Sequence, residues 1–125
     1  MTLRCGIDIV EIDRIKKLLD SSEKRFLSRV FTEVEVKYCE GRRNSRYESY
    51  AATFCAKEAV AKALGSGIAK GVELRDIEIT HDESGKPCVN LHKRAKEIYE
   101  EIGGENIDIS LTHCEEYAAA NCVII

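Results

Sequence analysis

Three charged residues of this sequence, Asp8, Glu58 and Lys62, stand among apolar and small residues. Residues four positions apart lie on one face of a helix, about one turn from each other, so a helix through the Ala-rich segment would make Glu58 and Lys62 neighbours. An ion pair on a solvated stripe is one interpretation of that spacing. A functional site is the other, because an unpaired charge inside tightly packed sequence is costly.

A magnesium ion would account for two carboxylates and an ammonium group in such surroundings. Magnesium prefers oxygen ligands, keeps several waters, and is typically held by one or two carboxylates together with substrate phosphates. Asp8 and Glu58 are therefore the candidate metal ligands, and Lys62 is the candidate contact for a phosphate oxygen. For Asp8 alone, a role in a turn or a cap near a strand end is the alternative.

The remaining residues that could do chemistry give weaker patterns. Gly65-Ser66-Gly67 looks like a phosphate-binding loop, but it follows a helix, whose C-terminal end carries partial negative charge, so a helix-capping glycine is expected. His113 shares the phase of the apolar residues of its strand, which leaves core packing and ligand contact both open. His81 and His92 are expected to be ordinary surface or strand residues.

Length and composition favour one compact domain, residues 1–125. Of the 125 residues, 44% are apolar and 33% are charged, and the single Pro and mixed charges mark no linker. A net charge of −3 argues against general nucleic-acid binding, which draws its affinity from neutralising phosphates. The basic residues between Arg14 and Arg29 fit either an acidic partner or an ordinary solvated helix face.

The sequence predicts a cytoplasmic protein with no membrane partner. Arg4 and Asp8 interrupt the apolar stretch that a signal peptide needs, and no run approaches the ~18 apolar residues of a membrane-spanning helix. The six cysteines form no C-x-x-C pair and no zinc-site spacing, so reduced thiols are expected. Cys5, Cys55 and Cys122 lie in apolar stretches and are expected to be buried.

The first half of the chain predicts one strand followed by helices. Alternation indicates a strand over Leu3–Val10, with Asp8 on the face opposite Ile7 and Ile9. A short helix is expected from an N-cap at about Asp13. Two capping-box patterns each predict the start of a helix. Thr32-x-x-Glu35 precedes a helix that runs to about Cys39. Ser45-x-x-Glu48 precedes a longer helix that runs to about Leu64 and ends at Gly65.

The second half of the chain changes to a period of two. Strands are expected around Ile77–Ile79, Val89–Leu91 and Ile107–Thr112, with a helix over about Lys93–Ile102. The last segment, Tyr117–Ile125, is apolar on both phases, as is typical of a strand covered on both faces. The expected fold class is α+β: a small antiparallel sheet packed with one long and several short helices.

Several blocks together resemble the bacterial holo-acyl-carrier-protein synthases, in the same order and spacing over almost the whole chain. The specific combination is a Gly-x-Asp block followed by a Lys-Glu-Ala-x-x-Lys block. The matching blocks are Gly6–Ile15, Phe31–Glu35, Phe54–Gly67, Asp76–Ile79, Gly85–Pro87, Ser110–His113 and Tyr117–Ala120.

This resemblance implies the 4′-phosphopantetheinyl transferase fold and a magnesium-dependent holo-[acyl-carrier-protein] synthase. Asp8 and Glu58 would bind magnesium together with the coenzyme A pyrophosphate, and Lys62 would contact the phosphates. A serine hydroxyl of apo acyl carrier protein would attack the β-phosphorus in line and release 3′,5′-ADP, which gives the holo carrier of fatty acid biosynthesis. The identity of the general base is left open.

Family members of this length form homotrimers with active sites at the subunit interfaces, so the resemblance implies that a neighbouring chain supplies coenzyme A contacts. The positions carried over as coenzyme A contacts are Lys62, Gly65, Gly85, Lys86, Pro87, Thr112 and His113. The basic helix would dock an acidic helix of the carrier protein, with Arg14 and Arg25 as the contacts.

One position departs from the family pattern. The family commonly has Arg immediately before the Phe of the long helix, and here that position is Thr53, so Arg43 or Arg46 is expected to supply the missing charge. Two rival functions remain: a non-catalytic trimer that binds a nucleotide or an acidic protein, and a small magnesium-dependent phosphohydrolase.

Overall fold

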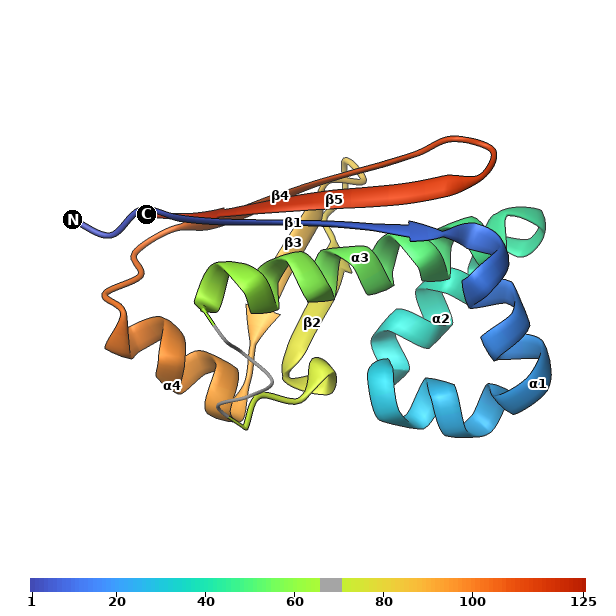
Figure 1. Ribbon diagram of the computed structural model, residues 1–125, viewed down its shortest axis with the longest axis horizontal. Coiled ribbons are helices and arrows are strands. Elements are labelled where there is room, and N and C mark those ends of the chain that lie inside the picture. The colour runs from blue at the N-terminus through green and yellow to red at the C-terminus, as the bar shows by residue number, and fades with distance from the viewer. Residues whose placement is uncertain (66–70) are drawn as a thin grey trace.

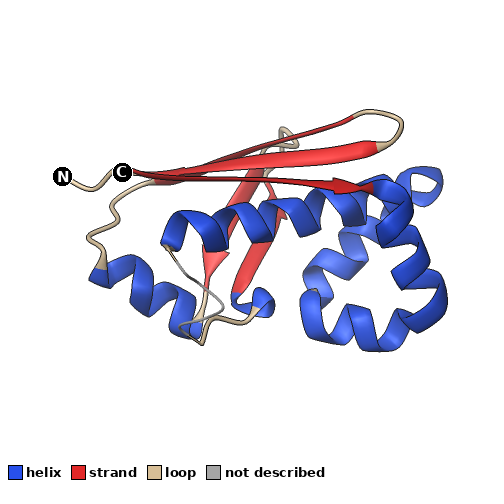
Figure 2. Ribbon diagram, in the orientation of Figure 1, coloured by secondary structure: helices blue, strands red, loops and turns tan. Residues whose placement is uncertain are grey.

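The computed structural model describes residues 1–65 and 71–125 and has an α+β fold with two antiparallel sheets (Figure 2). The larger sheet has three strands in the order β1-β5-β4, and the smaller is a hairpin of β2 and β3. The expected fold class is confirmed. The strands are β1 (Arg4–Glu11), β2 (Ile77–His81), β3 (Pro87–Leu91), β4 (Ile107–His113) and β5 (Tyr117–Ile124).

The helices pack on one side of the three-stranded sheet. They are α1 (Ile12–Val30), α2 (Glu33–Gly41), α3 (Arg46–Leu64) and α4 (Lys93–Glu101), with short 3-10 turns at Arg43–Ser45 and Leu74–Asp76. Figure 1 shows α3 running beneath the three-stranded sheet, with α1 and α2 near one end and α4 near the other. No helix in the described ranges is both long and apolar enough to cross a bilayer.

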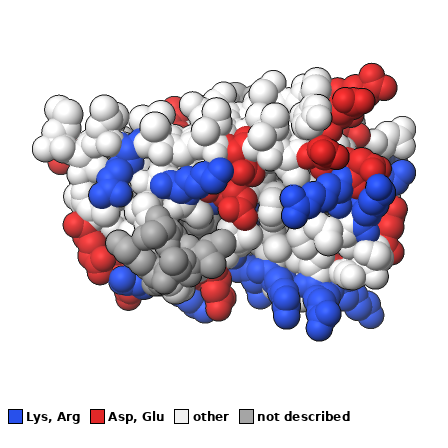
Figure 3. All heavy atoms as spheres, in the orientation of Figure 1, with Lys and Arg blue, Asp and Glu red and all other residues white. Residues whose placement is uncertain are grey.

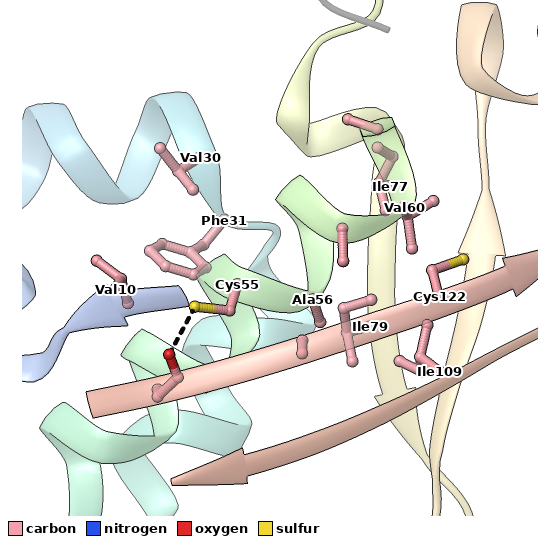
Figure 4. Packing of buried hydrophobic residues seen from close by; sticks show 14 of the residues in the cluster. Val10, Val30, Phe31, Cys55, Ala56, Val60, Ile77, Ile79, Ile109 and Cys122 are labelled. Carbon is pink, nitrogen blue, oxygen red and sulfur yellow. Dashed lines mark hydrogen bonds between the residues drawn. The ribbon is translucent and has the colours of Figure 1, made fainter. Parts of the chain in front are cut away.

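α3 forms the centre of the core because small residues let it pack on nearly all sides. Figure 4 shows Cys55, Ala56 and Val60 of α3 among side chains from the sheets, including Ile79 and Cys122. Each of these five side chains is at most 1% exposed. Burial of a full aliphatic side chain contributes roughly 1.5–3 kcal/mol, so this cluster is a main source of stability.

At Gly6, strand β1 touches the backbone of α3. A Cβ atom added there would lie 2.0 Å from the carbonyl oxygen of Ala59 and 2.7 Å from the amide nitrogen of Ala63. Real Cβ atoms do not approach backbone atoms so closely, so only glycine allows the two elements this separation. The contact sets how β1 lies across α3.

A buried ion pair joins α3 to α2 and β2. Lys57 donates to Oε1 of Glu35, and both side chains are 0% exposed. Glu35 also accepts from the amides of Thr32 and Ile79, each at 2.8 Å, so its oxygens are satisfied by hydrogen bonds. Burial lowers the pKa of Lys57, and Glu35 opposes that shift. Loss of either partner would leave an uncompensated buried charge, which costs about 3–5 kcal/mol.

Two of the three expected N-terminal caps differ from the structure, although α3 begins directly after Ser45 as predicted. The box at Thr32 is confirmed, with both of its hydrogen bonds formed. α1 begins at Ile12, not after an Asp13 cap, because its first amide donates to the carbonyl oxygen of Glu116 at 2.9 Å. Ser45 makes no side-chain cap bond, since it ends a 3-10 turn and lacks the extended backbone of an N-cap.

α1 is also longer than expected and is bent. Its backbone leaves helical geometry at Ser22, with φ −147° and ψ 42°. The hydroxyl of Ser21 donates to the carbonyl oxygen of Lys17 at 2.7 Å, a back-bond that commonly bends helices. The bend separates Arg14 from the later basic residues Lys24, Arg25 and Arg29.

The outer face of the three-stranded sheet is apolar and uncovered. The strand over β1 is confirmed, but Ile7 and Ile9 are 70% and 64% exposed, while Gly6, Asp8 and Val10 face α3. Cys5 shares the outer phase and is exposed, so its expected burial is wrong, whereas Cys55 and Cys122 are buried as expected.

β5 is covered on one face only within this chain. Tyr117, Val123 and Ile125 are 42%, 38% and 46% exposed, so the expected coverage of both faces is not met. Together with β1, the strand leaves a contiguous apolar surface, which marks an interaction site more often than a solvated one.

Substitution of Gly6 by Ala tests the close contact. The added Cβ cannot fit without moving β1 away from α3, and overpacking of this kind typically costs 1–3 kcal/mol. We expect the free energy of unfolding, measured with urea, to fall by at least about 2 kcal/mol. Gly41→Ala is the control, because a Cβ there meets nothing within 4 Å. Equal stability of the two variants would contradict the contact.

Candidate active site

The expected trio of charged side chains converges where β1 crosses α3. Asp8 lies on the inner phase of β1, opposite to Ile7 and Ile9 as predicted. Nζ of Lys62 donates to Oδ1 of Asp8 at 3.1 Å and to the carbonyl oxygen of Ile7 at 2.9 Å. Glu58 lies one helical turn before Lys62 on α3. Residues more than fifty positions apart are thus in direct contact.

The electrostatics of this cluster are unfavourable without a further positive charge. Burial raises the pKa of Glu58, and the nearby Asp8 carboxylate raises it further, while Lys62 opposes the shift. Burial, with Asp8 as the next cause, also raises the pKa of the neighbouring Cys55 thiol to about 12. One ammonium group therefore faces two carboxylates that repel each other.

The two carboxylates suit magnesium better than a metal that needs a complete protein cage. No group of three or more His, Cys, Asp or Glu side chains in the described ranges could hold a metal ion. Magnesium needs no more than one or two carboxylates when substrate phosphates and waters complete its shell. The repulsion between Asp8 and Glu58, and the 18% exposure of the Asp8 side chain, fit such a partly built site.

A separate groove of about 610 Å³ gathers four of the other predicted positions. It is lined by Gly85, Lys86 and Pro87 of the β2–β3 turn and by His113 at the end of β4. The turn is well ordered by hydrogen bonds: Oδ1 of Asp82 accepts from the amides of Ser84 and Lys86, both at 2.9 Å. Gly85 has φ +88°, a value that favours glycine.

Thr112 and Gly65 lie outside that groove. Thr112 is exposed on the strand phase opposite to Ile109 and does not line the groove. Gly65 ends α3 with φ +79°, and its amide donates to the carbonyl oxygen of Lys62 at 3.0 Å, as expected of a capping glycine. The Ser66 and Gly67 part of the Gly65-Ser66-Gly67 expectation lies outside the described residues.

Sequence reasoning did not identify several residues that line the groove, among them Tyr38, Arg42 and His81. The rings of Tyr38 and His81 stack with centroids 3.7 Å apart, at an angle of 11°. His81 is the last residue of β2, as a strand residue was expected, but no local pattern indicated its ring partner on α2. His92 is an ordinary surface residue, 3.1 Å from Glu78.

Thr53 shares its groove with an arginine other than the two expected. Thr53 is only 4% exposed and lines the groove. Arg46, one of the two expected substitutes, is held by Glu23 and Glu40 at 2.8 and 3.0 Å. Neither Arg46 nor Arg43 is among the groove residues, whereas Arg42 is.

The two expected carrier contacts occupy different parts of the bent helix. Arg14 lines a second groove of about 570 Å³ between α1 and β5, together with Lys17 and Tyr117. Arg25 lies beyond the bend at Ser22 and is exposed. In Figure 3, Lys and Arg side chains gather along the lower edge of the molecule at the end where α1 lies.

One chain does not bring the two parts of the expected site together. Asp8, Glu58 and Lys62 are absent from the residues that line the 610 Å³ groove. The charged cluster and the groove with Lys86 and His113 are therefore distinct regions of the described surface.

Comparisons with known proteins agree with the resemblance seen in the sequence. Residues 4–122 match the model of the 4′-phosphopantetheinyl transferase superfamily. A holo-[acyl-carrier-protein] synthase of Ruminiclostridium cellulolyticum is 48% identical over 124 residues, which cover 99% of this chain and 92% of that relative.

Solved structures show the same fold at lower identity. The Helicobacter pylori holo-[acyl-carrier-protein] synthase in complex with coenzyme A superposes with a TM-score of 0.84 at 31% identity, covering 97% of this chain and 99% of that one. A coenzyme A complex of the acyl-carrier-protein synthase of Chronobacterium ammoniagenes gives a TM-score of 0.88 at 28% identity, over 100% of this chain and 98% of that one.

The raised pKa of Glu58 predicts a pH-dependent cost to stability. A carboxyl group whose pKa is higher in the folded than in the unfolded state destabilises the protein once it ionises, and the cost vanishes below its ordinary value of 4.5. In a chelating buffer, Glu58→Gln should raise the free energy of unfolding at pH 7, and the gain should shrink toward zero at pH 4. Urea unfolding across that range measures the effect. Glu100→Gln, at an exposed position on α4, should show no such gain.

Proposed function

We propose that this chain, which belongs to the 4′-phosphopantetheinyl transferase superfamily, transfers the 4′-phosphopantetheine group of coenzyme A to a serine hydroxyl of apo acyl carrier protein. Relatives that cover nearly the whole chain are holo-[acyl-carrier-protein] synthases, and solved relatives bind coenzyme A. The observation that carries the proposal within this chain is the contact of Asp8 with Lys62, beside a Glu58 that Asp8 perturbs.

In this reaction the serine oxygen forms a bond to the β-phosphorus of coenzyme A as the bond to the bridging oxygen breaks. The serine hydroxyl loses its proton to a base, and 3′,5′-ADP leaves with the bridging oxygen. The ammonium group of Lys62 has three N–H donors, and Asp8 and Ile7 account for two of them. The third is available to a phosphate oxygen, where it would offset charge that develops during transfer.

Asp8 and Glu58 are the residues that would hold magnesium in this proposal. A magnesium ion there would neutralise charge on the pyrophosphate and orient it for in-line displacement. Without a metal ion, the carboxylates of Asp8 and Glu58 repel each other, and this repulsion contributes to the raised pKa of Glu58. A bound cation would relieve the repulsion. The metal would therefore bind more weakly as the pH falls and Glu58 takes up a proton.

A homotrimer would bring the two parts of the site together. The outer face of β1 and β5 leaves large apolar side chains exposed, and burial of such a face against a second copy is favourable. In the assembly we propose, Asp8, Glu58 and Lys62 of one chain face the groove of its neighbour, which contributes Gly85, Lys86, Pro87 and His113. Gly65 and Thr112 are proposed as further contacts with coenzyme A.

Arg14 and Arg25 are proposed to dock the acidic carrier protein, which would be modified for fatty acid biosynthesis. Arg14 lines the groove beside β1, the strand that carries Asp8, so a carrier bound there would lie near the charged cluster. Both arginines are exposed, and contacts between exposed charges weaken as salt screens them. The Michaelis constant for the carrier should therefore rise with ionic strength.

A mass-spectrometric transfer assay tests the proposed function. With coenzyme A, magnesium and apo acyl carrier protein, the carrier should gain the mass of phosphopantetheine. Glu58→Ala should lower the rate by at least about a hundredfold, because the site loses a metal ligand. Glu100→Ala should transfer normally. Binding of coenzyme A without carrier modification would favour the non-catalytic alternative, and phosphate release without a carrier would favour the phosphohydrolase.

An Ile9→Glu variant tests the proposed assembly. A charge on the apolar outer face would be buried without a partner in the trimer, so the variant should sediment as a monomer and lose transfer activity. Val34→Glu is the matched control, because Val34 is a similarly exposed apolar residue, 53% against 64% for Ile9, but lies on α2. A trimeric and active Ile9→Glu protein would refute this interface.

A further inference from the structure

The middle of α1 is held by polar contacts rather than by burial. Every side chain from Asp20 to Arg25 is exposed. Leu19 before this segment is buried, and Phe26 after it is partly buried. The backbone leaves helical geometry within the segment, at Ser22, and Figure 1 shows α1 turning along its length. Because no side chain of the segment is buried, its orientation depends on the few contacts that its polar side chains make.

Two neighbouring residues at the start of α3 make these contacts, one on each side of the bend. The hydroxyl of Tyr47 donates to Oδ1 of Asp20 at 2.9 Å, before Ser22. The guanidinium group of Arg46 donates to Oε1 of Glu23 at 2.8 Å, after Ser22. The two hydrogen bonds therefore join both halves of α1 to adjacent residues of one helix.

Arg46 is held in place by more than its contact with α1. Its side chain is 23% exposed, and its Nε donates to both carboxylate oxygens of Glu40 on α2, at 3.1 and 3.0 Å. Glu40 also accepts from the hydroxyl of Tyr50, a buried residue of α3, at 2.6 Å. An isolated ion pair at a surface contributes little, but a network of fixed geometry contributes more. A guanidinium group that binds two carboxylates has little freedom, so Arg46 holds Glu23 in one place.

The angle of the bend sets the separation of the two arginines proposed to contact the carrier protein. Arg14 precedes the bend and Arg25 follows it. A change of the backbone angle at Ser22 would move Arg25 relative to Arg14. An acidic helix of a partner presents its carboxylates at fixed spacings, so binding depends on the separation of the two guanidinium groups.

We propose that Arg46 is a positioning residue for carrier recognition, which fixes Arg25 relative to Arg14 by holding Glu23 beyond the bend. The inference rests on the proposed function, because it takes Arg14 and Arg25 as the carrier contacts. Arg46 lines neither the 610 Å³ groove nor the 570 Å³ groove that contains Arg14. It therefore acts through its neighbours and not by contact with either substrate.

Steady-state transfer tests this role when the carrier and coenzyme A are varied in turn. Arg46→Ala should raise the Michaelis constant for the carrier about fivefold, because the docking cations are no longer prealigned. Both kcat and the Michaelis constant for coenzyme A should stay within about twofold of the wild type. Arg46→Lys should recover part of the loss, since it keeps the charge but cannot bind Glu23 and Glu40 in the same fixed geometry.

An Arg25→Ala background separates positioning from a direct contact. If Arg46 acts through Arg25, Arg46→Ala should add nothing once Arg25 is absent, whereas a direct contact or a general loss of stability would add its full effect. Glu23→Ala, at a half-exposed position, should also raise the Michaelis constant for the carrier. Removal of a negative charge by itself would have the opposite sign, because it favours an acidic partner.

Arg94→Ala is the matched control. Arg94 also pairs with two glutamates, Glu97 at 3.2 Å and Glu101 at 3.0 Å, but both belong to its own helix, α4. This variant should change neither Michaelis constant.

Three results would overturn the assignment. They are a lower Michaelis constant for the carrier in Glu23→Ala, an additive effect of Arg46→Ala with Arg25→Ala, and an Arg46→Ala variant that weakens coenzyme A or neither substrate. A wild-type protein that transfers nothing would instead refute the proposed function.

Discussion

The contact between the backbones of β1 and α3 at Gly6 is the constraint on which the charged cluster depends. Because no side chain separates the strand from the helix, the carbonyl oxygen of Ile7 comes within 2.9 Å of Nζ of Lys62. Asp8 follows Gly6 by two residues and lies on the same face of the strand, so it is placed beside Glu58 and Lys62 of α3. A bulkier residue at this crossing would separate the carboxylate from its partners.

The adjacent residues Lys57 and Glu58 lie in different environments, because a helix rotates about 100° per residue. Lys57 points into the core and forms a fully satisfied buried pair with Glu35. Glu58 faces β1 and has no such compensation, so burial and Asp8 raise its pKa. Strain of this kind is expected where a site is built for a ligand, since perturbed pKa values cluster at functional sites.

The outer face of the three-stranded sheet shows why a strand pattern does not identify its own buried side. Ile7 and Ile9 are the most apolar residues of β1, yet they lie on its exposed face, and the inner face carries Gly6 and Asp8. This arrangement is costly for an isolated chain but reasonable for one that associates. In the proposed trimer, the groove of a neighbouring chain would lie against the charged cluster of the first chain.

Local signals in the sequence were sufficient for the elements and for part of the site. Helical spacing predicted α3, the Thr32 box predicted the start of α2, and strand alternation placed Asp8 opposite Ile7. These features depend on neighbours within one or two turns, which sequence spacing describes directly. Three features were decided by the tertiary structure alone. They are the hydrogen bond from the amide of Ile12 to the carbonyl oxygen of Glu116, the buried ion pair of Lys57 with Glu35, and the groove lined by Tyr38, Arg42 and His81. Those contacts join residues whose separation along the chain carries no periodic signal, so only packing of the whole chain determines them.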